Sequence, residues 1–258
     1  MADRSKFEAL LSEGNSESTE GWDFSWLNGR ATEGRPSWKY LVSLSKRMNS
    51  ADAVLDVQTG GGECFAEVLS QIENRPEFLG ATESWPPNVK IARHTLGSFG
   101  ATVMEVSDDG VFPFEDESFD LVCSRHPTVT VWREIERVLR PGGTYFSQQI
   151  GAGTNSELTD FFMGRQPISH DQRMDRAISL ATSTGLEVLN AQEESMPVIF
   201  LDVGAVIYFL RKVIWTVPDF SVEKYRDRLM LLHEQIEHDG SFTSHSQRFI
   251  VEAKKPVE

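Results

Sequence analysis

The sequence predicts an α/β fold with a doubly wound, mostly parallel sheet. Short apolar runs typical of strands alternate with segments of helical periodicity, and the first of these strands leads directly into three consecutive glycines. The predicted strands, seven in all, cover residues 53–57, 78–82, 102–106, 119–124, 144–149, 186 to about 195, and 248–253. The carboxyl ends of parallel strands meet at one edge of such a sheet, and ligands bind there.

Helices are expected between these strands, where apolar residues recur at helical spacing. They cover residues 63–72, 87–96, 131–139 and 171–184. The third helix is expected to stop at the Pro141-Gly142-Gly143 turn. After Ile150 we expect a polar loop, and a mostly helical insert at about 198–245 should precede the last strand.

Residues 1–50 are predicted to form a helical cap on a single domain of residues 51–258. Helical spacing occurs at 4–11 and 37–48, and four aromatic residues lie between or beside these segments: Trp22, Phe24, Trp26 and Trp38. So many aromatic side chains are unusual in a disordered tail, so the segment should pack onto the domain. It either covers the ligand site or anchors a helix against the edge of the sheet.

Composition favours a soluble cytoplasmic protein. The chain has 258 residues, 40% of them hydrophobic and 25% charged, and no apolar run approaches the roughly 20 residues that span a bilayer. The N-terminus lacks the apolar core of a signal peptide, and the two cysteines, Cys64 and Cys123, lie inside predicted elements. We therefore expect no membrane association and a cytoplasmic location.

The net charge of −14 argues against a nucleic-acid partner, because a negative surface repels polyanions and no run of lysine and arginine offsets it. A small neutral or cationic substrate remains compatible with this charge, which also promotes solubility. No cluster of His, Cys and carboxylate side chains has metal-ligand spacing, so no metal is expected. The oligomeric state is left open.

Four segments together resemble the class I S-adenosylmethionine-dependent methyltransferases, including small-molecule enzymes of the ubiquinone-biosynthesis type. They are VLDVQTGGGECF (54–65), GATESWPPN (80–88), FPFEDESFDLV (112–122) and ERVLRPGGTYF (136–146), within a likeness that covers roughly residues 51–149. The resemblance implies a Rossmann-like sheet whose last strand is antiparallel to its neighbour. It also implies S-adenosylmethionine as cofactor.

The glycine loop matches other nucleotide sites less well. A phosphate-binding loop would need Gly-Lys-Ser/Thr, whereas Gly62 is followed by Glu63 and Cys64. A dinucleotide fingerprint would need a third glycine where Phe65 stands. These differences disfavour NAD and nucleoside triphosphates.

The resemblance assigns the cofactor to the carboxyl ends of four strands and the loops that follow them. The expected contacts are Asp56, Gln58, Thr59, Gly60, Gly61, Gly62, Glu83, Ser84, Trp85, Asp108, Asp109 and Arg125. Backbone amides of the glycines would face the methionine carboxylate, and Glu83 would accept hydrogen bonds from the ribose hydroxyls. Trp85 would cover the adenine, and Asp108, or its rival Asp109, would accept from the adenine amino group. Gln58 stands where the family usually has its first glycine, so a side-chain hydrogen bond is expected to replace that residue's role.

Each of these residues also has a structural alternative. The three glycines could simply form a tight turn from strand to helix, and Glu83 could be a solvated loop carboxylate. Arg125 could bind an acidic substrate, bind the cofactor carboxylate or pair with the acidic surface.

His126 is the leading catalytic candidate, because it follows the fourth strand on the edge where the methyl group would lie. Histidine suits proton transfer near neutral pH, although His126 could instead contact the cofactor or only hydrogen-bond the loop. Tyr208, on an otherwise apolar helix of the insert, is a second candidate, and Gln148 or Gln149 could touch substrate. The family's amino-methylating DNA enzymes carry Asn/Asp-Pro-Pro-Tyr where this chain has CSRHPT, which disfavours adenine methylation.

The sequence therefore predicts transfer of a methyl group to an oxygen or nitrogen, less often a carbon, of a small molecule. The alternatives are a protein that binds S-adenosylmethionine or its demethylated product without catalysis, and a methyltransferase acting on protein or RNA.

Overall fold

The computed structural model describes residues 4–21 and 23–257, so Trp22 lies outside the described residues. Internal contacts divide the chain into two compact units. Unit 1 comprises Met1–Arg35, Gly153–Ser169 and Ser195–Gln247; unit 2 comprises Pro36–Ala152, His170–Glu194 and Arg248–Glu258. The division at residue 50 into a cap and a domain stays a prediction.

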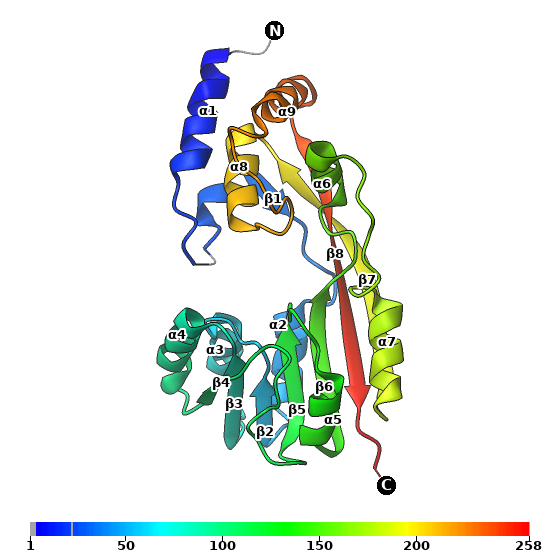
Figure 1. The fold of residues 1–258 in the computed structure, drawn as a ribbon. Helices are drawn as coiled ribbons and strands as arrows, with labels where there is room; N and C mark the ends of the chain where they lie inside the picture. The colour runs from blue at the N-terminus through cyan, green and yellow to red at the C-terminus, as the bar shows by residue number, and fades with distance from the viewer. Residues whose placement is uncertain (1–3, 22, 258) are drawn as a thin grey trace. The chain divides into compact units, whose positions relative to one another are not determined.

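The strands form one mixed sheet in the order β1-β7-β8-β6-β5-β2-β3-β4 (Figure 1). They are β1 (Ala31–Glu33), β2 (Ala53–Asp56), β3 (Phe78–Glu83), β4 (Thr102–Glu105), β5 (Phe119–Arg125), β6 (Leu139–Ile150), β7 (Glu187–Phe200) and β8 (Phe242–Lys254). From β4 across to β6, neighbouring strands are parallel, whereas β8 runs antiparallel to β6. The α/β class and the antiparallel last strand are confirmed.

The predicted count of seven strands is wrong, because the described residues form eight. The additional strand is β1, which pairs antiparallel with Val198–Phe200 of β7. Its three residues, Ala-Thr-Glu, carry no alternating pattern, so only the partner strand reveals it.

The sheet of unit 2 is covered by helices on both faces. These helices are α2 (Tyr40–Met48), α3 (Glu63–Gln71), α4 (Pro86–Gly97), α5 (Trp132–Val138) and α7 (Met174–Ser183). Successive residues of β2 enter opposite cores: Leu55 packs with Ile135 of α5, whereas Val54 packs with Val68 of α3. Because β2 is buried on both faces, the residues just before the glycine loop form a continuous apolar run.

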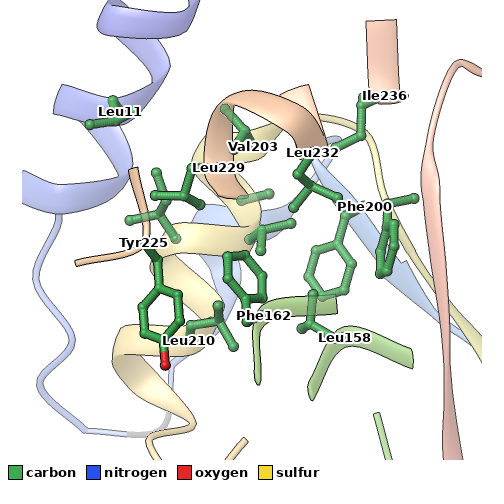
Figure 2. Close-up of a cluster of buried hydrophobic side chains, with 14 of the residues drawn as sticks. Leu11, Leu158, Phe162, Phe200, Val203, Leu210, Tyr225, Leu229, Leu232 and Ile236 are labelled. Carbon is green, nitrogen blue, oxygen red and sulfur yellow. The ribbon is translucent and has the colours of Figure 1, made fainter. Parts of the chain in front are cut away.

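Unit 1 has a separate hydrophobic core, part of which Figure 2 shows. Its helices are α1 (Arg4–Ser16), α6 (Ser156–Met163), α8 (Val203–Lys212) and α9 (Arg226–Asp239), with a short 3-10 turn η1 (Ser25–Leu27). Helices α1 and α8 approach closely at glycines, since a Cβ on Gly14 would lie 2.4 Å from the carbonyl oxygen of Gly204. Helix α6 occupies the place where we expected a polar loop, because Leu158 and Phe162, one turn apart, are both buried.

The aromatic residues of the N-terminal segment divide between the units. Trp26 lies against Tyr208 of α8, with ring centroids 4.9 Å apart, and Phe24 lies beneath the ammonium of Lys212. Trp38 belongs to unit 2 and contacts β6. The prediction that these side chains pack is confirmed for the three described residues.

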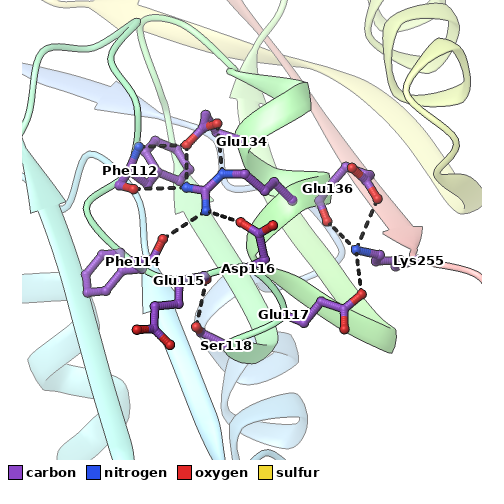
Figure 3. A network of polar contacts seen from close by, with 10 residues as sticks. Phe112, Phe114, Glu115, Asp116, Glu117, Ser118, Glu134, Glu136 and Lys255 are labelled. Carbon is purple, nitrogen blue, oxygen red and sulfur yellow. Dashed lines mark hydrogen bonds and ion pairs between the residues drawn. The ribbon is translucent and has the colours of Figure 1, made fainter.

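Arg137 of α5 organises the acidic turn that precedes β5. Figure 3 labels its partners Phe112, Phe114, Asp116 and Glu134. Its guanidinium donates to the carbonyl oxygens of Phe112 and Phe114, both at 2.9 Å, and pairs with Glu134 and Asp116 at 2.7 Å. Glu134 in turn accepts from the Phe112 amide at 2.7 Å. The Arg137 guanidinium therefore balances the acidic side chains of this turn and supplies hydrogen-bond donors to its backbone carbonyl groups.

Within residues 4–21 and 23–257, no helix combines the length and the apolar character needed to cross a membrane.

We expect Arg137→Leu to lower the free energy of unfolding by about 2–4 kcal/mol, because it leaves Glu134 and two carbonyls without their donor. The matched control is Arg140→Leu, whose side chain is 43% exposed against 25% for Arg137 and which should lose no more than about 1 kcal/mol. Urea unfolding of both variants measures the difference, and equal losses would contradict this role of Arg137.

Candidate functional site

Asp56 is buried at the carboxyl end of β2, directly beside Cys123 of β5 in the parallel register. Its oxygens accept from the Thr59 hydroxyl at 2.6 Å and from the Cys123 thiol at 3.4 Å. The pKa of Asp56 is raised to about 6, mainly because the carboxyl group is buried, and the nearby Glu83 charge contributes to the increase. The two hydrogen bonds lower the pKa but do not offset the effect of burial.

The three glycines form the turn from β2 into α3, and two of them have positive φ, 65° at Gly60 and 82° at Gly62. A Cβ at Gly62 would lie 2.8 Å from the Leu96 side chain of α4, so this position must stay small. Among the described residues, the Gly61 amide has no hydrogen-bond partner. That amide and the N-terminal turn of α3 are therefore available to an anion.

Glu83 is buried at the end of β3 and connects the two loops on either side of it. One carboxylate oxygen accepts from the Gly60 amide at 2.8 Å, and the other accepts from the Trp85 amide at 3.0 Å. A carboxylate can accept about four hydrogen bonds, so roughly two positions remain for a ligand. Ser84 is partly buried, whereas the Trp85 side chain is 52% exposed and so available to stack on a flat group.

Gln58 has φ 57° and joins the loop after β2 to the loop after β5. Its amide oxygen accepts from the Thr128 amide at 2.6 Å, and its amide nitrogen donates to the Val129 carbonyl at 2.7 Å. The expected side-chain hydrogen bond is present. The Thr128 hydroxyl also donates to Asp108 at 2.6 Å, so Asp108 belongs to the same hydrogen-bonded network as Gln58. Asp109 is exposed.

His126 follows β5 with φ 57°, and its backbone amide donates to the Gln148 carbonyl at 2.7 Å. Its ring Nε2 lies 2.9 Å from the Nε2 of Gln148, whose Oε1 accepts from the indole N–H of Trp38 at 2.7 Å. The sequence predicts that Gln148 or Gln149 touches substrate, and it places Trp38 in a segment that either covers the ligand site or anchors a helix.

Arg125, at the end of β5, is exposed, and its guanidinium lies 3.3 Å from the Cys64 thiol. Within the part of the chain that the structure describes, it forms no ion pair. Its nearby charge nevertheless lowers the pKa of Asp56, so the role of Arg125 stays a prediction. A free guanidinium at this edge suits an anionic group.

Residues 55–147 match the family model for the methyltransferase domain. The chain is 25% identical over 224 residues to the malonyl-[acyl-carrier protein] O-methyltransferase of Marinomonas sp. (strain MWYL1), covering 81% of this chain and 82% of that protein. It is 29% identical over 143 residues to the ubiquinone/menaquinone biosynthesis C-methyltransferase UbiE of Geobacter sp. (strain M21), covering 48% of this chain and 57% of that protein. Among solved structures, a candidate methyltransferase from Bacillus halodurans superimposes with a TM-score of 0.59 at 17% identity, covering 84% of this chain and 99% of that chain.

These matches support a class I S-adenosylmethionine-dependent methyltransferase, with residues 55–147 as its methyltransferase domain. The relatives and the family model support an enzyme with methyltransferase activity, as the sequence predicts. The residues that we expected to contact the cofactor all lie in unit 2 of this methyltransferase.

Tyr208 of the methyltransferase lies in unit 1, on α8. It is 2% exposed, its hydroxyl donates to the Asp23 carbonyl at 3.0 Å, and it accepts from the Lys212 ammonium at 3.2 Å. These contacts hold the segment after α1 against α8. A catalytic role for Tyr208 stays a prediction.

We expect the stability of the methyltransferase to fall as pH rises from about 4 to about 6 through Asp56. Because the folded pKa of about 6 exceeds the ordinary value of 3.8, the folded state binds the proton more tightly over this range, and ionisation then costs about 3 kcal/mol. Relative to wild type, Asp56→Asn should therefore gain about that amount between pH 4 and pH 7 in urea unfolding. Asp52→Asn, an exposed carboxylate just before the same strand, is the matched control, and a constant difference for Asp56→Asn would contradict the expectation.

Proposed function

We propose that this enzyme transfers a methyl group from S-adenosylmethionine to an oxygen or nitrogen, less often a carbon, of a small molecule. The observation that carries the proposal is the edge formed by β2, β3 and β5. There a glycine turn with a free amide, a buried carboxylate with unused acceptor positions and an exposed tryptophan follow neighbouring strands.

The residues present fit the cofactor. The Gly61 amide and the first turn of α3 would hold the methionine carboxylate, with Arg125 able to add a charge-assisted bond. The free acceptor positions of Glu83 would take the ribose hydroxyls, and Trp85 would cover the adenine. Asp108 keeps one oxygen unused by Thr128 for the adenine amino group. When bound, the cofactor supplies an electrophilic methyl group on a sulfonium.

Two observations support a small acceptor. The net charge of −14 disfavours RNA, and the relative that matches most of the chain acts, by its name, on the oxygen of a malonyl group. That malonyl group is carried by a protein, so an acyl chain on a carrier is a second form in which a small acceptor could arrive. A cytoplasmic location stays a prediction.

A non-catalytic binding protein is the second candidate, and Gln58 is the observation that favours it. A glutamine at the usual first glycine closes the loop onto Thr128 and Val129. Binding of the cofactor without turnover of any acceptor would support this candidate.

We expect wild-type protein to bind S-adenosylmethionine and its demethylated product with a dissociation constant in the micromolar range. Glu83→Ala should weaken binding at least about tenfold, because it removes both the ribose acceptor and the support of the Gly60 amide. Calorimetric titration measures both values. The matched control is Glu77→Ala, an exposed glutamate just before the same strand, which should bind like wild type.

Absence of binding in the wild type would contradict the proposal. Equal binding by Glu83→Ala would contradict the role assigned to Glu83.

Transfer itself is tested with a tritiated methyl donor and a panel of carboxylic acids, acyl-carrier conjugates, amines and phenols. We expect transfer to at least one oxygen or nitrogen acceptor, with loss of transfer in Glu83→Ala. Binding of the donor with no transfer to any class would favour the non-catalytic candidate instead.

A further inference from the structure

Three side chains of unit 2 form a hydrogen-bonded chain that ends at His126. Trp38 precedes α2, Gln148 lies on β6, and His126 follows β5. The two bonds are 2.7 Å from indole to amide and 2.9 Å from amide to imidazole. Trp38 and His126 are partly buried, and Gln148 is 5% exposed.

The direction of this chain follows from chemistry alone. An indole N–H can only donate, so the atom of Gln148 that faces Trp38 must be the oxygen. The amide NH₂ of Gln148 then faces His126, and because this group can only donate, the Nε2 of His126 must accept. His126 is therefore the neutral tautomer with its proton on Nδ1.

Both ends of the chain are held in place. The Ser43 hydroxyl donates to the Trp38 carbonyl at 2.7 Å, and the Tyr40 hydroxyl donates to the Ser124 carbonyl at 2.9 Å, which ties the start of α2 to the end of β5. The backbone of His126 bonds to the same Gln148 whose side chain faces its ring. Rotation of the amide would break the indole bond, so the tautomer is fixed by the fold.

Within residues 4–21 and 23–257, no acidic side chain is among the groups that shift the pKa of the His126 ring. The charged groups near it are Arg125 on β5 and Arg248 on β8, and both lower its pKa, although burial is the larger cause. The pKa of His126 falls to about 3. Among the described residues, Nδ1 has no partner, so its N–H is free to donate.

We propose that Trp38 and Gln148 are positioning residues that keep His126 neutral, so that its Nδ1–H donates to an acceptor that is already nucleophilic, such as a carboxylate. The inference rests on the proposed function and restricts the methyl acceptor to groups that are already nucleophilic. It replaces the expectation of a general base at His126, because the nitrogen that would take a proton already accepts from Gln148.

A carboxylate acceptor needs no base. A lone pair of its oxygen forms the new C–O bond while the S–C bond breaks, the S–C electron pair stays on sulfur, and no proton moves. The enzyme's task is then to align the oxygen and exclude water, and one donor from His126 with one cation at Arg125 suits that task.

The tautomer is tested without any cofactor by long-range ¹H–¹⁵N NMR of the full chain. The protein has 6 histidines, so loss of one signal in His126→Asn assigns His126. We expect wild-type His126 to carry its proton on Nδ1 and to show no titration from pH 5 to 8.

Gln148→Glu is the decisive variant, because a carboxylate accepts from both neighbours. It should move the proton to Nε2 and bring His126 titration into the range of pH 5–8. Gln192→Glu, an exposed glutamine of β7, is the matched control and should leave the His126 signals unchanged. A wild-type signal with its proton on Nε2, or one that titrates near pH 6.5, would overturn the inference.

The acceptor class is tested on the wild type and on Gln148→Glu with the acids and phenols that turn over. We expect kcat/KM for a carboxylic acid to be flat from pH 6 to 8 and to fall roughly 10- to 100-fold in the variant. A preference for phenols with a rate that follows one ionisation near pH 6.5 would overturn the inference while leaving the methyltransferase function intact.

Discussion

The pairing of β2 with β5 is the contact on which the candidate site depends. Order along the sheet reverses there, since β3 and β4 extend to one side of β2 and β6 to the other side of β5. Because both strands end together, with Asp56 beside Cys123, the glycine loop and the loop that carries His126 leave the sheet side by side. Gln58 then joins these loops through Thr128 and Val129. The residues assigned to the cofactor lie at the carboxyl ends of these two strands and of β3 and β4, or in the loops that follow them.

Glu83 shows how one buried charge can serve both the fold and a ligand. Its two oxygens each accept one backbone amide, from Gly60 and Trp85, and these bonds set the loop conformations before any ligand arrives. A diol would add to these bonds rather than replace them, because a carboxylate has acceptor positions to spare. The site is therefore shaped in advance, which lowers the entropy lost on binding.

Local patterns in the sequence predicted most of unit 2, because alternating and helical periodicities record burial within a single element. They missed β1 and α6 and shortened β6, β7 and β8, because those boundaries depend on distant partners such as Val198–Phe200. The glycine turn and Glu83 were found from motif spacing. Trp38 was not, because its indole finds Gln148 across 110 positions and no spacing rule covers that distance. The sequence signal for this contact was the pair of adjacent amide side chains at Gln148 and Gln149.

Two titratable groups of the site, the buried Asp56 and the partly buried His126, are both shifted toward their neutral forms, with pKa values of about 6 and about 3. At neutral pH, Asp56 is mostly ionised and accepts from Thr59 and Cys123, whereas the accepting nitrogen of His126 is occupied by Gln148. His126 therefore offers no free proton acceptor at this edge of the sheet. In the proposed reaction, His126 would contribute alignment and exclusion of water, which is sufficient for a nucleophile that arrives ionised.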